Sequence, residues 1–434
     1  MLRLEEKIRD KSATIGIVGL GYVGLPLAVA FAMARFKVLG FDTQQKRTAL
    51  VNQGSSYIAD VSSDSLSSVV TGKLLEATTD QSRLGEVDAI CVCVPTPLTT
   101  TKDPDLSYVI HESKTISKYL QPGQLVVLES TTYPGTTKQV VLPNLESSGL
   151  RCGIDFYLAY SPERVDPGSK DYNVKNTPKI VGGIDPQSTQ LAQLLYSQIA
   201  GMVLPVSCPE VAEMTKVFEN VFRSVNIALV NELAHLCEKM GLSVWEVIGA
   251  ASTKPFGYMP FYPGPGIGGH CIPLDPYYLA NKAREFDFHT RFIELAAEIN
   301  EHMPYHVVFR ILELLNTRGK SLNGAKILIL GIAYKKDVED TRESPALKII
   351  QLLREKGAEV SYNDPYVSQI HVPAGDIESV ELSEECLASM DCVVIVADHS
   401  CYNMGEVVAR AKLVFDTRGV TRGLKHDNIV RLGE

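Results

Sequence analysis

Residues 14–42 read TIGIVGLGYVGLPLAVAFAMARFKVLGFD, and this stretch decides the fold. The short apolar run at 14–18 is rich in β-branched residues and predicts a strand, and the run at 28–36 predicts a helix. Residues 37–42 predict a second strand that ends in Asp42. A strand, a tight turn, a helix and a strand in this order predict the first crossover of a parallel sheet.

The turn between the first strand and the helix carries the pattern G-x-G-x-x-G at Gly19, Gly21 and Gly24. The first glycine permits a tight turn, the second lets the backbone approach a pyrophosphate, and the third lets helix and strand pack closely. Asp42 follows Gly24 by 18 residues, where an acid can hold ribose hydroxyls and repel a 2′-phosphate. The motif therefore predicts a site for NAD rather than NADP, although Arg47 nearby weakens that preference. The alternative is a glycine-rich turn with only a structural role.

The rest of the chain predicts a second α/β region and a helical middle. AICVCVP near residue 90 and LVVLEST near residue 126 predict two more buried strands, and alternation with helices favours a parallel sheet covered on both faces. From about residue 324 the same pattern recurs, with a predicted strand and turn at 325–334 and predicted strands in 358–364 and 391–399. We therefore predict two Rossmann-like doubly wound domains, 1–207 and 316–434, joined by a central long-helix domain at 208–315.

Composition excludes several classes of protein. The chain has 434 residues and a formal net charge of −9, so no basic surplus is present for broad binding of nucleic acid. Its nine cysteines are scattered and lack C-x-x-C spacing, which predicts no disulfide framework, no metal site and a reducing, cytoplasmic compartment. The uncharged segment 12–34 has the hydropathy of a membrane helix, but its glycine motif explains it better, so no membrane role is expected.

The segment 254–276, KPFGYMPFYPGPGIGGHCIPLDP, is irregular and lies between two predicted helices, 209–240 and one that begins after 291. Loops held between helices are where ligand contacts are expected. Cys271 follows Gly268 and Gly269, and small neighbours let a substrate carbon approach the sulfur. A thiolate adds to an aldehyde and leaves again, which suits covalent catalysis. The alternative is a buried cysteine without chemistry, as expected of the cysteines in apolar runs.

Charged side chains elsewhere fit the same chemistry. Lys216 and Asn220 are four residues apart and share one face of the predicted helix. Glu163 lies in a turn after an apolar strand, and Lys335 and Arg342 follow the first strand of the second α/β region. Local spacing leaves the alternative of solvated surface charges open for each of them.

Seven motifs, taken together, resemble the UDP-glucose/UDP-mannuronate dehydrogenase family over essentially the whole chain. They are GIVGLGYVGLPLA, VPTPL, EST, SPER, TKVFEN, GPGIGGHC-x-x-x-D and GIAYKKDVEDTRESP, and they occur in the family's order. The sequences of the segment 254–276, the cysteine loop, and of VPTPL most resemble the UDP-N-acetylglucosamine 6-dehydrogenase branch. The segment GIAYKK lacks the glycines of a pyrophosphate turn, so the resemblance implies that the second α/β domain binds UDP.

The resemblance implies a role for each matching position. Cys271 is expected to be the nucleophile, Lys216 and Asp275 to stabilise the oxyanion with Asn220 beside them, and Glu163 to be the base for thioester hydrolysis. Thr131 is expected beside the nicotinamide and a catalytic water, and His270 has no assigned role. The expected NAD contacts are Gly19, Gly21, Tyr22, Val23, Gly24, Asp42, Arg47, Pro95, Thr96, Thr131 and Arg342. The expected substrate contacts are Glu163, Arg164, Lys216, Asn220, Tyr262, Gly268 and Lys335.

The implied reaction is a four-electron oxidation of the C6 hydroxyl of a UDP-hexose to a uronate by two hydride transfers to NAD⁺, through a thiohemiacetal and a thioester on Cys271. UDP-N-acetylglucosamine is the expected substrate, for synthesis of surface polysaccharide precursors, and UDP-N-acetylmannosamine and UDP-glucose are the alternatives. A single-step β-hydroxyacid dehydrogenase and a noncatalytic NAD-sensing module are rival classes. The long apolar helix also suits a homodimer or a higher homo-oligomer.

Overall fold

The computed structural model describes residues 3–58, 60–99, 103–165, 172–269, 272–372 and 375–434. The chain forms two compact units. Unit 1 comprises Met1–Glu219 and Tyr277–Phe288, and unit 2 comprises Asn220–Pro276 and His289–Glu434. The chain passes from unit 1 to unit 2 within the long helix α8 (Pro209–Met240) and returns briefly through α10 (Asp275–Arg284).

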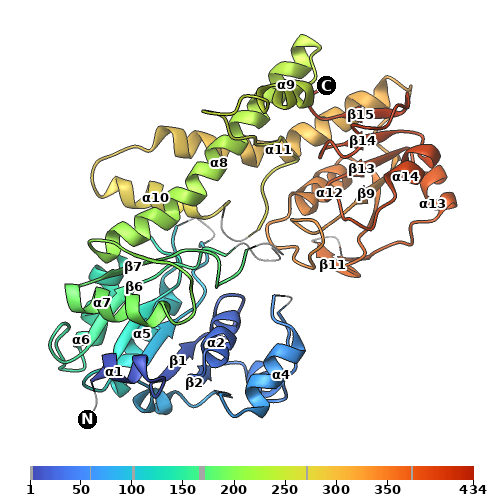
Figure 1. Ribbon diagram of the computed structural model, residues 1–434. Helices are drawn as coiled ribbons and strands as arrows, with labels where there is room; N and C mark the ends of the chain where they lie inside the picture. Colours follow the sequence, from blue (N-terminus) through green and yellow to red (C-terminus); the bar gives the residue numbers. More distant parts are fainter. Residues whose placement is uncertain (1–2, 59, 100–102, 166–171, 270–271, 373–374) are drawn as a thin grey trace. The chain divides into compact units, whose positions relative to one another are not determined.

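The main sheet of unit 1 has the strand order β3-β2-β1-β4-β5-β6-β7-β8 (Figure 1). Its first six strands in this order run parallel to one another, as the sequence predicts for a doubly wound sheet. The register pairs Val18 with Phe41 and Val18 with Val92, so the strand ends that carry the predicted NAD contacts lie along one edge. The strands are β1 (Thr14–Val18), β2 (Lys37–Phe41), β3 (Leu75–Thr78), β4 (Ala89–Val92), β5 (Leu125–Leu128), β6 (Tyr157–Tyr160), β7 (Lys179–Gly183) and β8 (Val203–Pro205).

Strand β7 departs from the expected parallel sheet, because it runs antiparallel to β6. A parallel neighbour needs a crossover that returns the chain to the opposite edge of the sheet, usually through a helix. No helix lies between β6 and β7 in the described residues, and the chain re-enters the sheet at the edge where β6 ends. The first residue of β7, Lys179, therefore lies at the edge where β4, β5 and β6 end.

Helices cover both faces of this sheet, since its alternating side chains build two separate hydrophobic cores. Ile15 and Ile17 of β1 point into the core that includes α2, α4 and α7. Val18 and the β4 residues Ile90 and Val92 point into the core that includes α5 and α6. The helices of unit 1 are α1 (Leu4–Arg9), α2 (Gly24–Met33), α3 (Gln45–Asn52), α4 (Ser63–Thr71), η1 (Gln81–Glu86), α5 (Ser107–Tyr119), η2 (Thr137–Val141), α6 (Leu142–Glu146) and α7 (Pro186–Tyr196).

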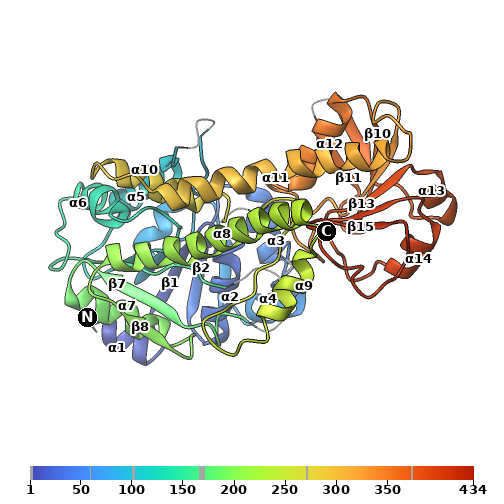
Figure 2. The same cartoon turned by 90° about the horizontal axis from the view of Figure 1, so that it is seen from above.

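Unit 2 contains a smaller parallel sheet with the order β10-β9-β13-β14-β15 and a β11-β12 hairpin (Figure 2). One face packs on α11 and α12, and the other on α13 and α14, which confirms the second doubly wound region. The strands are β9 (Lys326–Leu330), β10 (Glu359–Asn363), β11 (Gln369–Val372), β12 (Gly375–Glu378), β13 (Cys392–Ile395), β14 (Val414–Asp416) and β15 (Ile429–Arg431), and the helices are α9 (Val244–Ala251), α11 (Arg291–Asn316), α12 (Pro345–Glu355), α13 (Glu384–Ser389) and α14 (Met404–Arg410).

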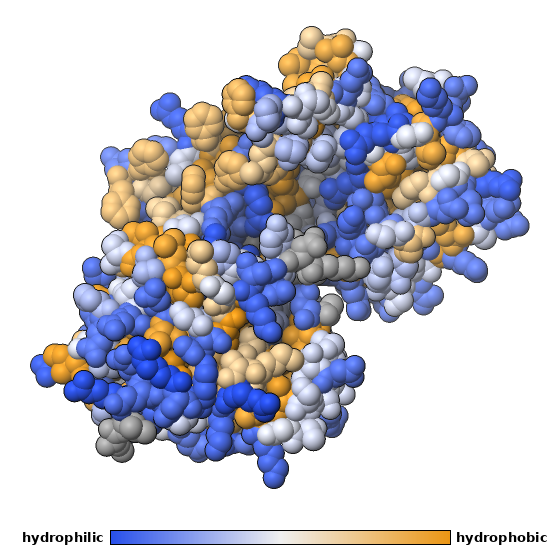
Figure 3. All heavy atoms as spheres, viewed as in Figure 1, coloured by the Kyte–Doolittle hydropathy of each residue, from blue (hydrophilic) through white to orange (hydrophobic). Residues whose placement is uncertain are grey.

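The predicted long helix 209–240 forms with its predicted bounds, and the second predicted helix begins at Arg291, one residue earlier than expected. Gly241, which has a positive φ of 68°, follows the last residue of α8 and ends the helix. In unit 2, α8 and α11 lie side by side, where Asn231 donates a hydrogen bond to Asn300 over 2.9 Å. Large hydrophobic side chains remain exposed around α11 (Figure 3). Those on α11 are Phe292, Leu295, Tyr305, Phe309 and Leu312, and those on α8 are Val211, Met214, Phe218, Phe222, Leu229, Leu236 and Met240.

Candidate functional site

The glycine turn of unit 1 has the geometry that a bound pyrophosphate requires. Gly19 adopts φ +92°, and a Cβ on it would lie 2.7 Å from the Cys93 carbonyl oxygen. A Cβ on Gly24 would lie 1.8 Å from the Gly19 oxygen, so helix α2 and the turn pack too closely for any side chain. A Cβ on Gly21 would meet nothing within 4 Å. The first and third glycines are therefore needed by the protein, whereas the second leaves an open cradle for a ligand.

Asp42 is held at the end of β2 beside this turn. Its carboxylate accepts hydrogen bonds from the backbone of Leu20 at 3.1 Å and of Gln44 at 2.9 Å. Arg47 lies 3.4 Å from the Asp42 Oδ2 atom, so the two predicted NAD contacts are ion-paired. Asp42 is buried, whereas the Arg47 side chain is partly exposed. Tyr22, at the turn, is exposed.

The segments that follow β4 and β5 come together as the sequence predicts. The Thr96 hydroxyl donates to the Thr131 carbonyl oxygen over 2.7 Å, and Ser130 donates to the Val94 oxygen over 2.7 Å. Sequence reasoning missed Tyr278 of α10, whose buried hydroxyl donates to the Thr96 oxygen over 2.5 Å. This hydrogen bond fixes the loop that carries Pro95 and Thr96 at the edge of the sheet, next to Thr131 of the neighbouring loop.

Glu163 follows β6 at the same edge and is held through both of its carboxylate oxygens. Its Oε1 accepts from the backbone N–H groups of Arg164 and Val165, both over 2.7 Å, and its Oε2 lies 3.5 Å from the Lys179 ammonium. Burial favours the neutral acid, but Lys179, the two amides and Lys216 outweigh it, and the pKa of Glu163 is lowered from its ordinary value. Glu163 is therefore a carboxylate in neutral solution.

Arg164, a predicted substrate contact, is engaged within the protein. Its guanidinium pairs with Glu219 of α8 over 2.5 Å and donates to the Pro178 carbonyl oxygen over 2.7 Å. This arrangement fixes the turn that carries Glu163. Whether Arg164 also contacts substrate stays a prediction.

Behind Glu163 lies a buried charge cluster that sequence reasoning missed. The Lys179 ammonium pairs with Glu129, which follows β5, over 2.5 Å. The Tyr196 hydroxyl donates to the other oxygen of Glu129, and Tyr196, Lys179 and Glu129 are all at most 3% exposed. Burial alone lowers the pKa of Lys179, but Glu129 and Glu163 outweigh it, and the pKa is raised. Lys179 is therefore an ammonium with two carboxylate partners.

The predicted oxyanion residues are buried. Lys216, on the unit 1 part of α8, is 8% exposed, and Asn220 is fully buried one helical turn further on. In unit 2, the Asn220 side-chain amide donates to Asp275, which begins α10, and Arg223 donates to the Asn220 oxygen. The Asn220–Asp275 contact fixes the carboxylate that the resemblance assigns to oxyanion stabilisation.

The predicted nucleophile, Cys271, and its neighbour His270 lie outside the described residues. The loop before them packs on the segment after β9 in unit 2. A Cβ on Gly268 would lie 2.6 Å from the Tyr334 Cβ, and the N–H of Gly269 donates to the Arg342 carbonyl oxygen over 3.0 Å. Both glycines therefore permit a close approach of two backbones.

The remaining predicted ligand contacts belong to the same unit. Arg342 is exposed and forms an ion pair with Asp340 over 2.5 Å, and Lys335 is partly buried in the same segment. Tyr262 is 48% exposed and stacks on Trp245, with ring centroids 6.2 Å apart. Arg342 and Tyr262 are therefore both at the surface of unit 2.

The cysteines of the apolar strands are buried, as expected of residues with a packing role. Burial raises the pKa of the Cys91 thiol, and that of the Cys392 thiol, to about 12. The part of the chain that the structure describes contains no group of three His, Cys, Asp or Glu residues able to hold a metal ion. Among the described helices, none is long and apolar enough to cross a membrane.

Three family models match consecutive parts of the chain. They are the NAD binding domain, the central domain and the UDP binding domain of the UDP-glucose/GDP-mannose dehydrogenase family, at residues 13–200, 210–302 and 328–423. Together they cover most of the sequence, including the glycine turn, the long helix and the segment after β9.

Curated relatives and solved structures agree with the family models. The chain is 39% identical over 361 residues to a UDP-N-acetyl-D-glucosamine 6-dehydrogenase of Pseudomonas aeruginosa, covering 82% of this chain and 84% of the relative. It is 36% identical over 417 residues to a UDP-N-acetyl-D-mannosamine dehydrogenase of Pyrococcus horikoshii, covering 94% and 96%. A solved structure of a UDP-D-ManNAc dehydrogenase from Pyrococcus horikoshii matches with a TM-score of 0.88 and 34% identity, covering 97% of this chain and 99% of that one.

Proposed function

The chain belongs to the UDP-glucose/GDP-mannose dehydrogenase family, and on that premise we propose that it oxidises the C6 hydroxyl of a UDP-N-acetylhexosamine to a carboxylate through a thioester on Cys271. It is an NAD-dependent oxidoreductase of the UDP-sugar dehydrogenase class. The observation that carries the proposed mechanism is Glu163, a half-buried carboxylate whose pKa is lowered by Lys179, by two backbone amides and by Lys216. A single alcohol oxidation needs an acceptor for the hydroxyl proton only, whereas hydrolysis of an acyl intermediate needs a second base that takes a proton from water.

The residues of the glycine turn fit NAD. Gly21 leaves open space where a Cβ would fill the cradle, and the carboxylate of Asp42 ends the next strand. NAD⁺, when bound, accepts a hydride from the substrate carbon. Asp42 supplies acceptors for the ribose hydroxyls and repels a 2′-phosphate, so the site favours NAD over NADP.

The covalent part of the proposal uses the chain's own groups. The Cys271 thiolate adds to the C6 aldehyde carbon, which gives a thiohemiacetal and keeps the aldehyde on the protein between the two oxidations. In the first oxidation the C6 hydroxyl proton leaves to a water that Lys216 and Asp275 bind. The Lys216 ammonium donates to the oxyanion, and a donor in such a position contributes about 3 kcal/mol. The Asp275 carboxylate, which accepts from Asn220, acts through that water. After the second oxidation, Glu163 takes a proton from water as the water oxygen bonds to the thioester carbon. The carbon–sulfur bond then breaks, which releases the uronate and the thiolate.

UDP-N-acetylglucosamine is the proposed substrate. The 39% identity to the UDP-N-acetyl-D-glucosamine 6-dehydrogenase of Pseudomonas aeruginosa supports this substrate, and so does the sequence of the cysteine loop. UDP-N-acetylmannosamine is the second candidate. The UDP-N-acetyl-D-mannosamine dehydrogenase of Pyrococcus horikoshii covers more of the chain, and a solved UDP-D-ManNAc dehydrogenase from that organism superimposes closely. Tyr262, Gly268 and Lys335 of the cysteine loop and the segment after β9 are the proposed sugar and nucleotide contacts.

A panel of UDP-sugars with NAD⁺ tests this function. The proposal predicts a higher kcat/KM for UDP-N-acetylglucosamine than for UDP-N-acetylmannosamine or UDP-glucose. It also predicts that two NADH form per sugar consumed. One NADH per sugar would indicate a single-step dehydrogenase, and none with retained NAD binding would indicate a sensing module. Either result would overturn the four-electron oxidation, whereas a preference for another of these sugars would overturn only the substrate assignment.

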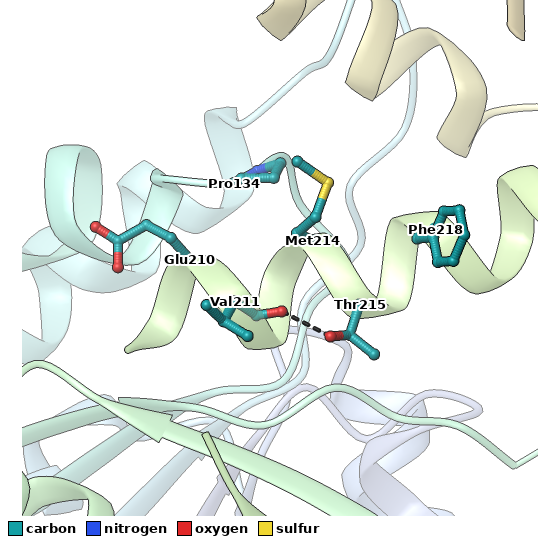
Figure 4. Close-up of a pocket in the computed structure, with 6 residues that line it drawn as sticks. All are labelled: Pro134, Glu210, Val211, Met214, Thr215 and Phe218. Carbon is teal, nitrogen blue, oxygen red and sulfur yellow. Dashed lines mark hydrogen bonds between the residues drawn. The ribbon is translucent and has the colours of Figure 1, made fainter. Parts of the chain in front are cut away.

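We also propose that the chain works as a homodimer or higher homo-oligomer in the cytoplasm, where it supplies precursors of surface polysaccharides. Val211, Met214 and Phe218 line an apolar cavity of about 400 Å³ on α8 with Pro134 (Figure 4). Exposed apolar groups of this density are typical of protein interfaces. The eight cysteines in the described residues are free, which supports a reducing compartment. Light scattering during size exclusion tests assembly, and a monomer at micromolar concentration would contradict it.

A further inference from the structure

The buried charge cluster of unit 1 joins Glu163 to residues that the proposed mechanism does not use. Lys179 lies between two carboxylates, with its ammonium 2.5 Å from Glu129 and 3.5 Å from Glu163. The ammonium also contacts the Pro162 carbonyl oxygen at 3.3 Å. The far oxygen of Glu129 accepts from the Tyr196 hydroxyl. The cluster is therefore a chain of contacts that starts in the core and ends at Glu163.

The topology of the sheet creates this chain. Tyr160 of β6 pairs with Gly182 of the antiparallel strand β7, and continuing the register by three residues brings Glu163 opposite Lys179. Glu129 reaches the same place because it follows β5 directly. Had β7 been parallel, its first residue would have lain at the opposite edge of the sheet.

Packing alone does not account for these charges. Lys179 and Glu129 are 3% and 1% exposed, and a buried ion pair is commonly no more stabilising than apolar side chains of similar volume. In this cluster, however, the ammonium has a second partner, whose side chain is 17% exposed and so has access to the surface of the unit. The Lys179 ammonium therefore faces Glu163 as well as Glu129.

We propose that Lys179, held by Glu129 and Tyr196, is a positioning residue that keeps the Glu163 carboxylate ionised and oriented to take a proton from the hydrolytic water. This inference rests on the proposed function of Glu163 as the base for thioester hydrolysis. Lys179 acts through Glu163 and needs no contact with substrate. Glu129 balances one charge of the cluster, and Tyr196 fixes the rotamer of Glu129.

The charges that face Glu163 within unit 1 determine the direction in which each variant shifts the pKa of Glu163. Lys179 on β7 and Lys216 on α8 favour the carboxylate, and so do the amides of Arg164 and Val165. Glu129 lies behind Lys179, and burial raises its pKa, so Glu129 takes up a proton at a higher pH than Glu163 does. Removing the charge of Lys179 therefore raises the pKa of Glu163, whereas Glu129 is already neutral in the pH range where Glu163 titrates.

The pH dependence of acyl-enzyme hydrolysis tests the proposal with the full-length chain, NAD⁺ and the most active UDP-sugar of the panel. Hydrolysis needs ionised Glu163, so the rate falls as the pH drops through the pKa of that group. We expect Lys179→Met to move this acidic limb upward by about one pH unit or more, and Glu129→Gln to leave it near the wild-type position. The double variant should match Lys179→Met, and Lys179→Arg should keep the wild-type limb. Rapid quenching and intact-mass analysis of the acylated protein measure the step directly.

A purely structural role would lower the hydrolysis rate in Lys179→Met and leave its acidic limb in place, and that result would overturn the proposal. If Lys179→Met does not fold, Lys179→Gln decides the matter, because an unmoved limb contradicts the inference and an upward shift supports it. Glu163→Gln separates the two levels of the argument. Normal hydrolysis in Glu163→Gln would refute the proposed function of Glu163. An accumulated acyl-enzyme there, with unmoved limbs in the other variants, would refute only the role of Lys179.

Discussion

The turn after β1 and the turn after β9 have the same construction but opposite uses. In unit 1 the N–H of Gly19 donates to the Phe41 oxygen, and Asp42 accepts from the next amide, that of Leu20. In unit 2 the N–H of Gly331 donates to the Asn363 oxygen, and Asp364 accepts from the amide of Ile332. Each turn thus places a carboxylate at the end of the second strand.

The difference lies in what else the carboxylate binds. Asp364 also accepts from the backbone of Ala333, Tyr366 and Val367 and from the ring of His399, which donates through Nε2 because its Nδ1 accepts from Asp337. Asp364 is 3% exposed, and its oxygens can accept few further hydrogen bonds from a ribose. The next helix begins 14 residues after Gly331, at Pro345, instead of at the turn itself. One acid is therefore available to a ligand, and the other serves the fold.

The largest effect on this comparison is expected from Gly21→Val. The side chain fills the cradle of the first turn, where a Cβ meets no protein atom within 4 Å. We expect the affinity for NAD⁺ to fall by at least about 100-fold, or roughly 3 kcal/mol, with little change in Tm. Gly423→Val in unit 2, where a Cβ also meets nothing within 4 Å, is the matched control and should bind NAD⁺ normally. Calorimetric titration measures both, and equal affinity in the two variants would remove the first turn as the cofactor site.

A smaller effect is expected from Asp364→Asn. The amide cannot accept all the hydrogen bonds of the carboxylate, so unit 2 should lose about 2 kcal/mol of stability and the protein should unfold about 5 °C lower. Asp42→Asn is the counterpart in unit 1, where we expect weaker NAD⁺ binding and a nearly unchanged Tm. Scanning calorimetry with and without NAD⁺ distinguishes the two. If Asp364→Asn weakened NAD⁺ binding and left Tm unchanged, the two acids would not differ in use.

The smallest effect is a pH dependence that belongs to the second turn. Burial favours neutral Asp364, but the hydrogen bond from His399 and those from the backbone outweigh it, and its pKa is lowered from 3.8. A lowered pKa contributes stability that is complete above the unfolded-state pKa and is lost as the pH falls through the folded-state value. Wild-type protein should therefore lose Tm below about pH 4 more steeply than Asp364→Asn. If the Tm of wild-type protein and the Tm of Asp364→Asn fell equally from pH 6 to pH 3, this contribution would be contradicted.

Local patterns in the sequence predict much of the site. The bounds of α8 and the strands around the first turn follow from short-range periodicity. Thr96 and Thr131, which the resemblance gives as NAD contacts, lie together because they follow neighbouring parallel strands. The absence of pyrophosphate glycines after β9 likewise indicates that the two turns differ. These features are predictable because neighbouring residues determine them.

The missed features depend on long-range topology. Lys179 opens an ordinary apolar strand, and its role becomes visible only when β7 is known to run antiparallel. The sequence offers one signal for it, a lysine followed directly by the buried run Ile180–Gly183. Tyr278 and His399 are similar, since each finds its partner in a segment far away in the chain. Strand direction and distant hydrogen bonds are not encoded in any local window.

The central claim is a four-electron oxidation that passes through Cys271, and counting NADH per UDP-sugar in two cysteine variants tests it most directly. Wild-type protein and Cys91→Ser, whose sulfur lies in the core of unit 1, should form two NADH per sugar consumed. Cys271→Ser should stall at or before the acyl stage, with steady-state turnover reduced by about 1,000-fold or more. Two NADH per sugar from Cys271→Ser at the wild-type rate would contradict the account.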